Sequence, residues 1–462
     1  MENSIQAKLN NRDRKYLDMS LNAPMWKVVL LIGTPLALYQ GLDILFTILD
    51  TMMASHISKE SVSAVAYLSQ VRLILSSVGG GLAVGAGILI SRAYGEGNFL
   101  LVRQRVSSLY AISLTVGLVM LGAIAPFARG FLRLAGTPEE LIAVGARYFV
   151  VQLFVMVVNF LNSVYIAVER ARGNARRIFL LNLLVILVKL ALTAYFVYGL
   201  HGDLTMIAVA SLLSELVMFV CAVRFSLVGG SAFSFSLRAV ALNRRVTAPM
   251  IAQSLPVIAE KALFAFGKTI VNSMCTLYGA LMVGAMGVSN NLGGITTNPQ
   301  NGYQQGSSAI ISQNYGAGKY RRVLDAFYAT AAINMLLGAL ISGLELWQLD
   351  LLSGLFDGGS PEFREMIALC YRYEALGAVP LGLNAAVLAL LYGLGKTRLT
   401  LLLNFSRVFL FRIPVFWFLQ NYTNVGQASV GMVMMISNTS VAVMALVVAL
   451  IVIRNYKKQY AL

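Results

Sequence analysis

Two stretches of this sequence, 221 residues apart, repeat one pattern: residues 81–97 read GLAVGAGILISRAYGEG, and residues 302–318 read GYQQGSSAIISQNYGAG. Seven of their 17 positions are identical at this single offset, which is improbable by chance. The same offset pairs Pro35 with Pro256. The chain is therefore a duplicated unit, and its fold must be one that two tandem copies can build.

The composition around these stretches is that of a membrane protein. Hydrophobic residues make up 58% of the 462 positions and charged residues 12%, whereas soluble domains carry roughly 25% charged residues. A helix needs about 20 apolar residues to cross the hydrocarbon layer. About twelve such windows occur, at 29–54, 62–91, 106–128, 140–167, 178–199, 205–228, 248–275, 281–313, 324–349, 366–393, 399–419 and 427–453.

The repeat and the windows together predict an all-α membrane protein with two six-helix lobes. Because six is an even number, both copies enter the membrane in the same direction, so a pseudo-two-fold axis along the membrane normal relates them. We expect a central cleft between the lobes, and a midplane site at such an interface is transporter architecture. The expected parts are a cytoplasmic tail 1–28, an N-lobe 29–228, a linker 229–247, a C-lobe 248–453 and a C-terminal tail 454–462.

The distribution of basic residues predicts the orientation. Most of the 36 lysines and arginines fall in the two tails and in the connections after even-numbered helices. The opposite side holds only Lys59, Arg129, Arg133 and Arg364. By the positive-inside rule both termini are cytoplasmic. This topology accounts for the formal net charge of +16 without a nucleic-acid partner.

The sequence offers no residues that would support an enzymatic function. The sequence contains no Ser-His-Asp grouping, no metal-ligand spacing and no phosphate loop. The two histidines, His56 and His201, fall in short external loops, and the three cysteines have no pair spacing. We therefore expect no enzyme activity, no bound metal and no cofactor beyond a transported coupling cation.

Four polar side chains form a stripe on the first helix. Gln40, Asp43, Thr47 and Asp50 are spaced so that they lie on one helical face. A carboxylate at membrane depth is costly, so Asp43 and Asp50 must face water or a cation, or stay protonated. Both options describe a proton or cation site; the alternative is a structural ion pair between helices.

The repeat offset places two lysines on the seventh helix opposite that stripe. Lys261 and Lys268 correspond to Gln40 and Thr47, and Arg407 and Arg412 on the eleventh helix could extend the same basic wall. A basic wall favours an anionic or zwitterionic solute. The alternative is that these side chains snorkel to the interfaces or neutralise buried glutamates, namely Glu215, Glu260, Glu345 and Glu374.

These motifs resemble the multidrug and toxic compound extrusion (MATE) family, and in particular its bacterial DinF-like branch. The residues that carry the resemblance are Pro35 with Leu49-Asp50-Thr51, the run from Gly81 to Gly97, and Gln313-Asn314-Tyr315-Gly316-Ala317-Gly318 followed by Arg321-Arg322-Val323. The resemblance covers nearly the whole chain. It implies a twelve-helix exporter that alternates between outward-open and inward-open states and uses a proton or sodium gradient. Asp50 matches the aspartate that couples transport to the ion.

The fifth helix departs from the family pattern. Members of this kind often read Asn-x-x-x-Asp-Pro there, and this chain reads Lys189-Leu190-Ala191-Leu192-Thr193-Ala194. An ammonium would repel a sodium ion, so the substitution favours proton coupling. We hypothesise a Lys189–Asp50 ion pair in one transport state, with Lys189 and Thr193 also in reach of the substrate.

The interpretation that follows is a secondary active exporter of a small or medium organic solute. We expect a monomer in the cytoplasmic membrane of a bacterium. Asp50 and Asp43 couple the cation, and the residues expected to contact substrate are Gln40, Thr47, Lys189, Thr193, Lys261, Lys268, Arg407 and Arg412. Two alternatives stay open. One is a flippase for a lipid-linked or glycan anion, and the other is a receptor or scaffold that does not transport.

Overall fold

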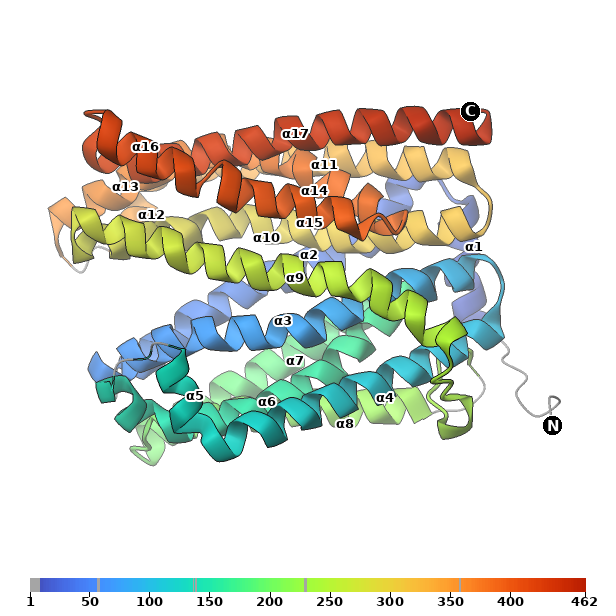
Figure 1. Cartoon of the computed structure of the whole chain (residues 1–462), viewed down its shortest axis with the longest axis horizontal. Helices are drawn as coiled ribbons and strands as arrows, with labels where there is room; N and C mark the ends of the chain where they lie inside the picture. The colour runs from blue at the N-terminus through green and yellow to red at the C-terminus, as the bar shows by residue number, and fades with distance from the viewer. Residues whose placement is uncertain (1–8, 56–58, 136, 138, 228–230, 357–358) are drawn as a thin grey trace. The chain divides into compact units, whose positions relative to one another are not determined.

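The computed structural model describes the backbone of residues 9–55, 59–135, 137, 139–227, 231–356 and 359–462, and the side chains of these residues apart from 43–67 and 144. Throughout these ranges the regular elements are helices (Figure 1). The all-α prediction is therefore confirmed.

Each predicted window coincides with one helix or one interrupted helix. In the first half these are α2 (Met25–Ser55), α3 (Lys59–Gly95), α4 (Phe99–Ile124), α6 (Glu139–Ala171), α7 (Ala175–Ala194) with η3 (Tyr195–Gly199), and α8 (Leu204–Leu227). In the second half they are α9 (Arg244–Cys275), α10 (Ala280–Gly316), α11 (Tyr320–Trp347), α13 (Pro361–Leu376) with α14 (Ala378–Gly393), α15 (Thr397–Phe405) with η6 (Ser406–Leu410) and α16 (Ile413–Tyr422), and α17 (Ser429–Tyr460).

By length and hydropathy, ten described helices can cross a membrane, and the bent pair α13 and α14 makes up to eleven. The remaining predicted span is α10. It has 37 residues, long enough to cross, but Asn, Gln, Ser and Thr lower its hydropathy.

Two of the predicted spans, 366–393 and 399–419, are each broken near a proline. The axis bends by 47° between α13 and α14, three residues before Pro380. The eleventh span contains a π-turn over Ser406–Leu410, just before Pro414 at the start of α16. A proline removes a backbone donor and clashes with the preceding turn, which accounts for both breaks.

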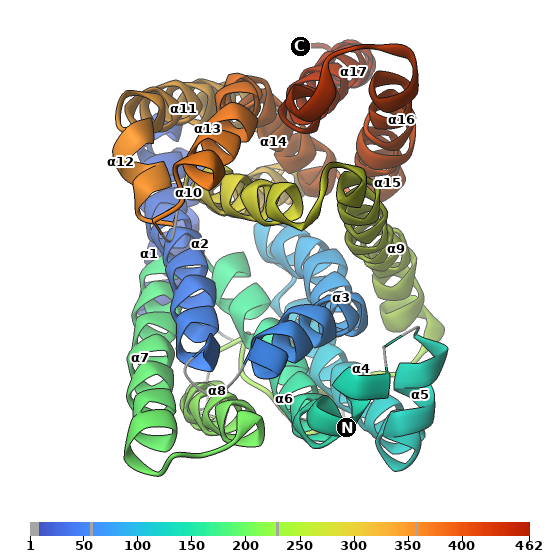
Figure 2. The ribbon, with the colours of Figure 1, turned by 90° about the vertical axis from the view of Figure 1, so that its left-hand side faces the viewer.

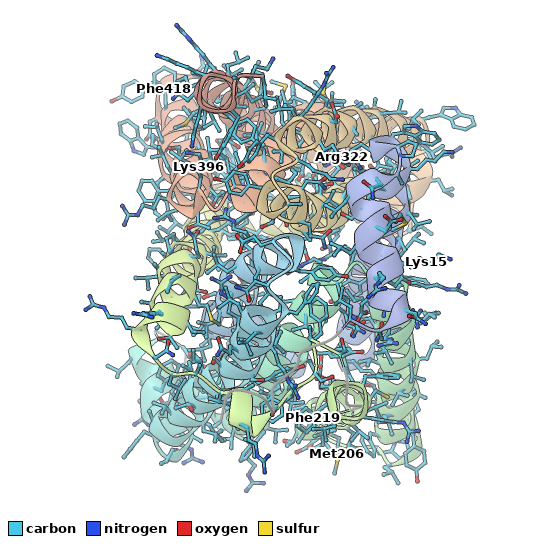
Figure 3. The ribbon with its side chains drawn as sticks, turned by 90° about the vertical axis from the view of Figure 1, so that its right-hand side faces the viewer. Lys15, Met206, Phe219, Arg322, Lys396 and Phe418 are labelled. Atoms are coloured by element: carbon cyan, nitrogen blue, oxygen red, sulfur yellow. The ribbon has the colours of Figure 1, made fainter. Side chains whose placement is uncertain are left out.

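Three short helices lie in the predicted polar tail and in two connections between spans. They are α1 (Asn11–Asn22), α5 (Ala128–Leu134) and α12 (Leu349–Gly354). At the C-terminal end of α1, Arg322 donates to the carbonyl oxygens of Ser20 (3.1 Å) and Ala23 (2.8 Å). Figure 3 shows Arg322 at this end of the helix and Lys15 pointing outward from it.

The chain forms two compact units. One comprises Met1–Met19 and Leu45–Ala262, the other Ser20–Ile44 and Leu263–Leu462. In the first unit α6 packs against α3, α4 and α8. In the second unit α14 packs against α10, α11 and α17, and α13 contacts both α10 and α17. Figure 2 shows α13 beside α11 and α14. The units therefore exchange parts of α2 and α9, and the simple lobe limits 29–228 and 248–453 stay a prediction.

The repeated glycines explain how α9 joins the first unit. A Cβ added at Gly85 would lie 2.4 Å from Cα of Ser254, and one at Gly81 would lie 2.8 Å from Cα of Ile258. Only glycine permits this separation. Small residues four apart allow helix backbones to approach closely in membranes, so the pattern holds α3 against the first part of α9.

The second copy of the motif does the same for α2. A Cβ at Gly302 of α10 would lie 2.5 Å from Cα of Ala37, and one at Gly306 would lie 3.4 Å from Cα of Gly33. Beside this contact, Thr34 Oγ1 and Tyr303 Oη are 2.8 Å apart. The duplicated glycine pair thus has one structural role in both halves.

The turns that follow these helices repeat as well. Gly97 (φ 74°) and Gly318 (φ 71°) adopt left-handed conformations at the repeat offset, as do Gly173 (φ 86°) and Gly395 (φ 73°) one residue out of it. After Gly97 the amide of Asn98 donates to the carbonyl of Ala93 (3.0 Å). This is the Schellman pattern that ends a helix at glycine.

Candidate functional site

The second unit contains a carboxylate enclosed by helices at membrane depth. Glu374 of α13 accepts a hydrogen bond from Ser289 Oγ of α10 (2.6 Å). A Cβ added at Gly293 would lie 2.8 Å from Glu374 Oε1. Gly293 lies one helical turn after Ser289. Because it has no side chain, it leaves the space that the carboxylate occupies.

Three cations act electrostatically on this carboxylate. The charges of Arg412, Lys268 and Arg407 all act on Glu374, yet among the described residues none of them forms an ion pair with it within 4.0 Å. One close carboxylate among three cations leaves an excess of positive charge in a region where charge is costly. We name Lys268, Glu374, Arg407 and Arg412 the C-unit charge cluster.

The π-turn aligns the two arginines of the cluster. Residues five apart in a regular α-helix point about 140° away from each other. Here the amide of Phe411 donates to the carbonyl of Ser406 (2.9 Å), which winds the chain more loosely. As a result Arg407 Nη2 (2.9 Å) and Arg412 Nη2 (3.0 Å) both donate to Asn438 Oδ1 of α17.

Other contacts fix the orientation of these guanidinium groups. Arg412 Nε also donates to Ser437 Oγ (3.0 Å), and Arg412 is 5% exposed. Arg407 lies over the ring of Phe264 at 5.5 Å, a cation–π contact. The two arginines are thus held by neutral partners and keep their charge available to an anion.

A second carboxylate of the unit makes its hydrogen bonds through one oxygen. Glu345 Oε2 of α11 accepts from Tyr371 Oη and from Thr296 Oγ1 (2.7 Å), whereas Oε1 is buried without a partner in the described structure. These contacts join α10, α11 and α13 and suit a structural role.

The first unit has its own membrane-depth carboxylate. Glu215 of α8 accepts hydrogen bonds from Asn162 Nδ2 (2.7 Å) and Asn159 Nδ2 (3.4 Å) of α6. The charges of Lys189 and Arg72 also act on it. Lys189 is half-buried on α7. One turn later the hydroxyl of Thr193 is buried without a hydrogen-bond partner in the described structure, which leaves a donor for a ligand or water.

The residues predicted for the basic wall do not all fall in one unit. Lys268, Arg407 and Arg412 meet in the C-unit charge cluster. Lys261 belongs to the other unit, where its Nζ would lie 3.6 Å from a Cβ at Gly80 and its charge interacts with Glu260 and Arg170. That Lys261 and Lys268 line one wall of a cleft stays a prediction.

The acidic stripe is only partly described. Gln40 is half-buried on α2. The side chains of Asp43, Thr47 and Asp50 lie outside the described residues, although the backbone there is helical as the spacing required. The Lys189–Asp50 pair therefore stays a prediction. Where side chains are described, no group of three His, Cys, Asp or Glu residues could hold a metal ion.

Several residues of the two units were not predicted as site residues. Glu374 and Glu215 were expected only to neutralise basic side chains, and no role was predicted for Ser289, Asn438 and the asparagines of α6. A signal was present, since Ser289, Gly293, Thr296 and Gln300 follow helical spacing on the most polar predicted span.

Comparisons with known proteins agree with this architecture. A protein-family model described as MatE matches residues 35–196 and 256–418. The two matches begin 221 residues apart, at Pro35 and Pro256, which is the offset of the internal repeat. A Bacillus subtilis (strain 168) protein described as "Probable multidrug resistance protein YoeA" is 22% identical over 325 residues, or 69% of this chain and 70% of that protein.

Two solved structures show the same fold. One, described as the outward-facing conformation of a multidrug resistance MATE family transporter of the MOP superfamily, has a TM-score of 0.91 at 18% identity and covers 98% of this chain and 100% of that chain. The other, from Pyrococcus furiosus, is described by the words "Reverse polarity of binding pocket suggests different function of a MOP superfamily transporter" and has a TM-score of 0.90 at 18% identity over 97% of this chain and 99% of that chain.

Such transporters have twelve membrane helices in two lobes, in agreement with the predicted count. The DinF-like branch stays a prediction. The double match, which covers more than two thirds of the sequence, shows that the chain belongs to the MatE family of membrane transporters.

Proposed function

We propose that this transporter exports an anionic or zwitterionic organic solute by cation-coupled antiport, with a proton rather than sodium as the coupling ion. It acts as a monomer in the cytoplasmic membrane of a bacterium, with both termini in the cytoplasm and no further cofactor. Asp50 is the coupling carboxylate, with Asp43 on the same stripe. Export of organic solutes is consistent with the multidrug resistance description of the Bacillus subtilis relative.

The C-unit charge cluster carries the substrate part of this proposal. Lys268, Arg407 and Arg412 share one nearby carboxylate, Glu374, which makes no direct ion pair with them among the described residues. Positive charge at membrane depth needs a counter-charge or water. An anionic substrate group would supply that counter-charge, whereas the cluster would repel a cationic drug. A structural relative is itself described as having a binding pocket of reverse polarity.

The proton part rests on the first helix and on Lys189. A carboxylate at membrane depth can hold a proton in one state and release it in another. Lys189 stands near Glu215 in the first unit and contributes a positive charge there. Such a charge disfavours bound sodium without preventing protonation of a carboxylate.

The test is a binding and transport screen on the purified protein. Anionic, zwitterionic and cationic solutes are compared by thermal shift on wild type, Lys268→Ala and the exposed-lysine control Lys396→Ala (Figure 3). We expect anions or zwitterions to raise the unfolding temperature of wild type and of Lys396→Ala. The increase should be smaller for Lys268→Ala. Transport into proteoliposomes under a proton gradient should be lost in Asp50→Asn and retained in Asp350→Asn, which changes an exposed carboxylate.

Binding of cations alone, with Lys268→Ala silent, would contradict the substrate assignment. Sodium-driven transport without a proton requirement would contradict the coupling ion. Movement of a lipid-linked anion without any ion gradient would favour the flippase instead.

A further inference from the structure

A polar cavity lies in the first unit, and Glu215 is not among the residues that line it. Its volume is about 320 Å³. It opens beside the C-terminal ends of α6 and α8. Six of its lining residues are arginines and serines: Arg172, Arg177, Arg224, Ser226, Ser231 and Ser234. Guanidinium groups and hydroxyls are the donors that phosphate groups prefer.

Aromatic rings orient two of the arginines. Arg177 lies over the ring of Phe225 at 4.3 Å, and Arg172 lies over the ring of Phe233 at 5.4 Å. Stacking on a ring fixes the plane of a guanidinium group. Arg172 already donates to Asp13 and Glu169, so its part is to hold the cavity wall in place.

The charge of the cavity is not balanced. Arg172 pairs with Asp13 (2.9 Å) and with Glu169 (2.7 Å), and Arg177 makes a longer contact to Glu169 (3.4 Å). Arg224 is exposed and forms no ion pair with any described carboxylate. Three cations thus face two carboxylates, and the unpaired cation, Arg224, is the exposed one, which marks the open side of the cavity.

The position of the mouth suggests where the ligand comes from. Arg224 lies near the end of the membrane span Leu204–Leu227. Its neighbours Phe225 and Leu227 are 36% and 59% exposed, so an apolar surface continues from the bilayer to the cavity. A soluble anion would not need this surface, whereas acyl chains would cover it. Basic pockets between membrane helices are known to take lipid head groups.

We propose that this cavity binds the phosphate head group of an anionic membrane lipid, with Arg224 as its principal contact. None of the residues that line the cavity is among the proposed substrate or coupling residues, so the proposal stands whether or not the transported solute is an anion.

The test measures lipid binding to the full-length protein in detergent. The probes are phosphatidylglycerol, phosphatidylcholine and inorganic phosphate, compared on wild type, Arg224→Gln and Arg238→Gln. Arg238 is an exposed arginine of the nearby linker and serves as the matched control. We expect phosphatidylglycerol to bind more tightly than phosphatidylcholine, and Arg224→Gln to weaken it about fivefold, the effect of one basic residue near an anionic lipid surface.

Equal binding of the two lipids would overturn the proposal, as would equal loss in Arg224→Gln and Arg238→Gln. Inorganic phosphate that binds in an Arg224-dependent way and displaces no lipid would assign the cavity to a soluble phosphate instead of a lipid.

Discussion

Glu374 is the residue on which the electrostatics of the second unit depend. It is the carboxylate on which Lys268, Arg407 and Arg412 all act. Its hydrogen bond to Ser289 and the space at Gly293 position it. Without its charge, three cations would remain at membrane depth with no nearby anion.

We therefore expect Glu374→Gln to lower the free energy of unfolding by about 3 kcal/mol, as for removal of one partner from a buried charge group. The control Glu362→Gln changes an exposed carboxylate in the first turn of the same helix and should have little effect. Thermal unfolding of both variants in detergent measures the difference. Equal stability would mean that water, and not Glu374, compensates the cations.

Asp13 anchors the N-terminal helix α1 to the first unit. Its side chain is fully buried and accepts hydrogen bonds from Arg172 Nε (3.0 Å) and Ser231 Oγ (2.7 Å), while its carbonyl accepts from Tyr94 Oη (2.5 Å). Burial lowers the pKa of Arg172, but the charges of Glu169 and Asp13 outweigh burial and raise it above its ordinary value. The guanidinium therefore stays charged at any physiological pH.

Replacing Asp13 by Asn should release α1. Loss of a buried partner costs about 3 kcal/mol, so amides of α1 that exchange by local opening should exchange about 100-fold faster. Hydrogen exchange followed by mass spectrometry measures this. Asp18→Asn, at an exposed position of the same helix, is the control. Unchanged protection of α1 would show that its other contacts hold it.

At the scale of elements, the duplicated glycine pairs join α3 to α9 and α10 to α2. The clash distances at Gly302 and Gly85 are to backbone atoms, which cannot move aside as a flexible side chain can. A methyl group there must separate two helices.

Gly302→Ala should therefore destabilise the protein by about 1–3 kcal/mol, the usual cost of overpacking. The control is Gly343→Ala on α11, where an added Cβ meets nothing within 4 Å and where alanine should be neutral or slightly stabilising. Thermal unfolding distinguishes them. A Gly302→Ala protein as stable as Gly343→Ala would mean that α2 and α10 separate freely.

For the whole molecule, the placement of lysines and arginines predicts that both termini are cytoplasmic. A green fluorescent protein fused after Leu462 should fluoresce, and alkaline phosphatase fused there should be inactive. Fusions in the connection between α7 and α8, near residue 201, should give the opposite pattern. An active phosphatase at the C-terminus would reverse the topology and the direction of proposed export.

The sequence by itself predicted about twelve apolar windows, each of which coincides with a helix or an interrupted helix, and the duplication. These are local properties, because the bilayer requires about 20 apolar residues per span and because a helix ends at a left-handed glycine such as Gly97 or Gly318. The resemblance to the family rested on the same local motifs, and the family match begins at the two prolines that the repeat had paired.

The tertiary structure alone decided which charges meet. Arg407 and Arg412 converge on Asn438 only because a π-turn interrupts their helix, and helical periodicity would have separated them. Lys261 and Lys268, seven residues apart on α9, fall in different units because α9 divides between them after Ala262. The pairing of Asp13 with Arg172 spans 159 residues. Such contacts depend on how distant helices pack, and a pattern that repeats every few residues carries no information about that packing.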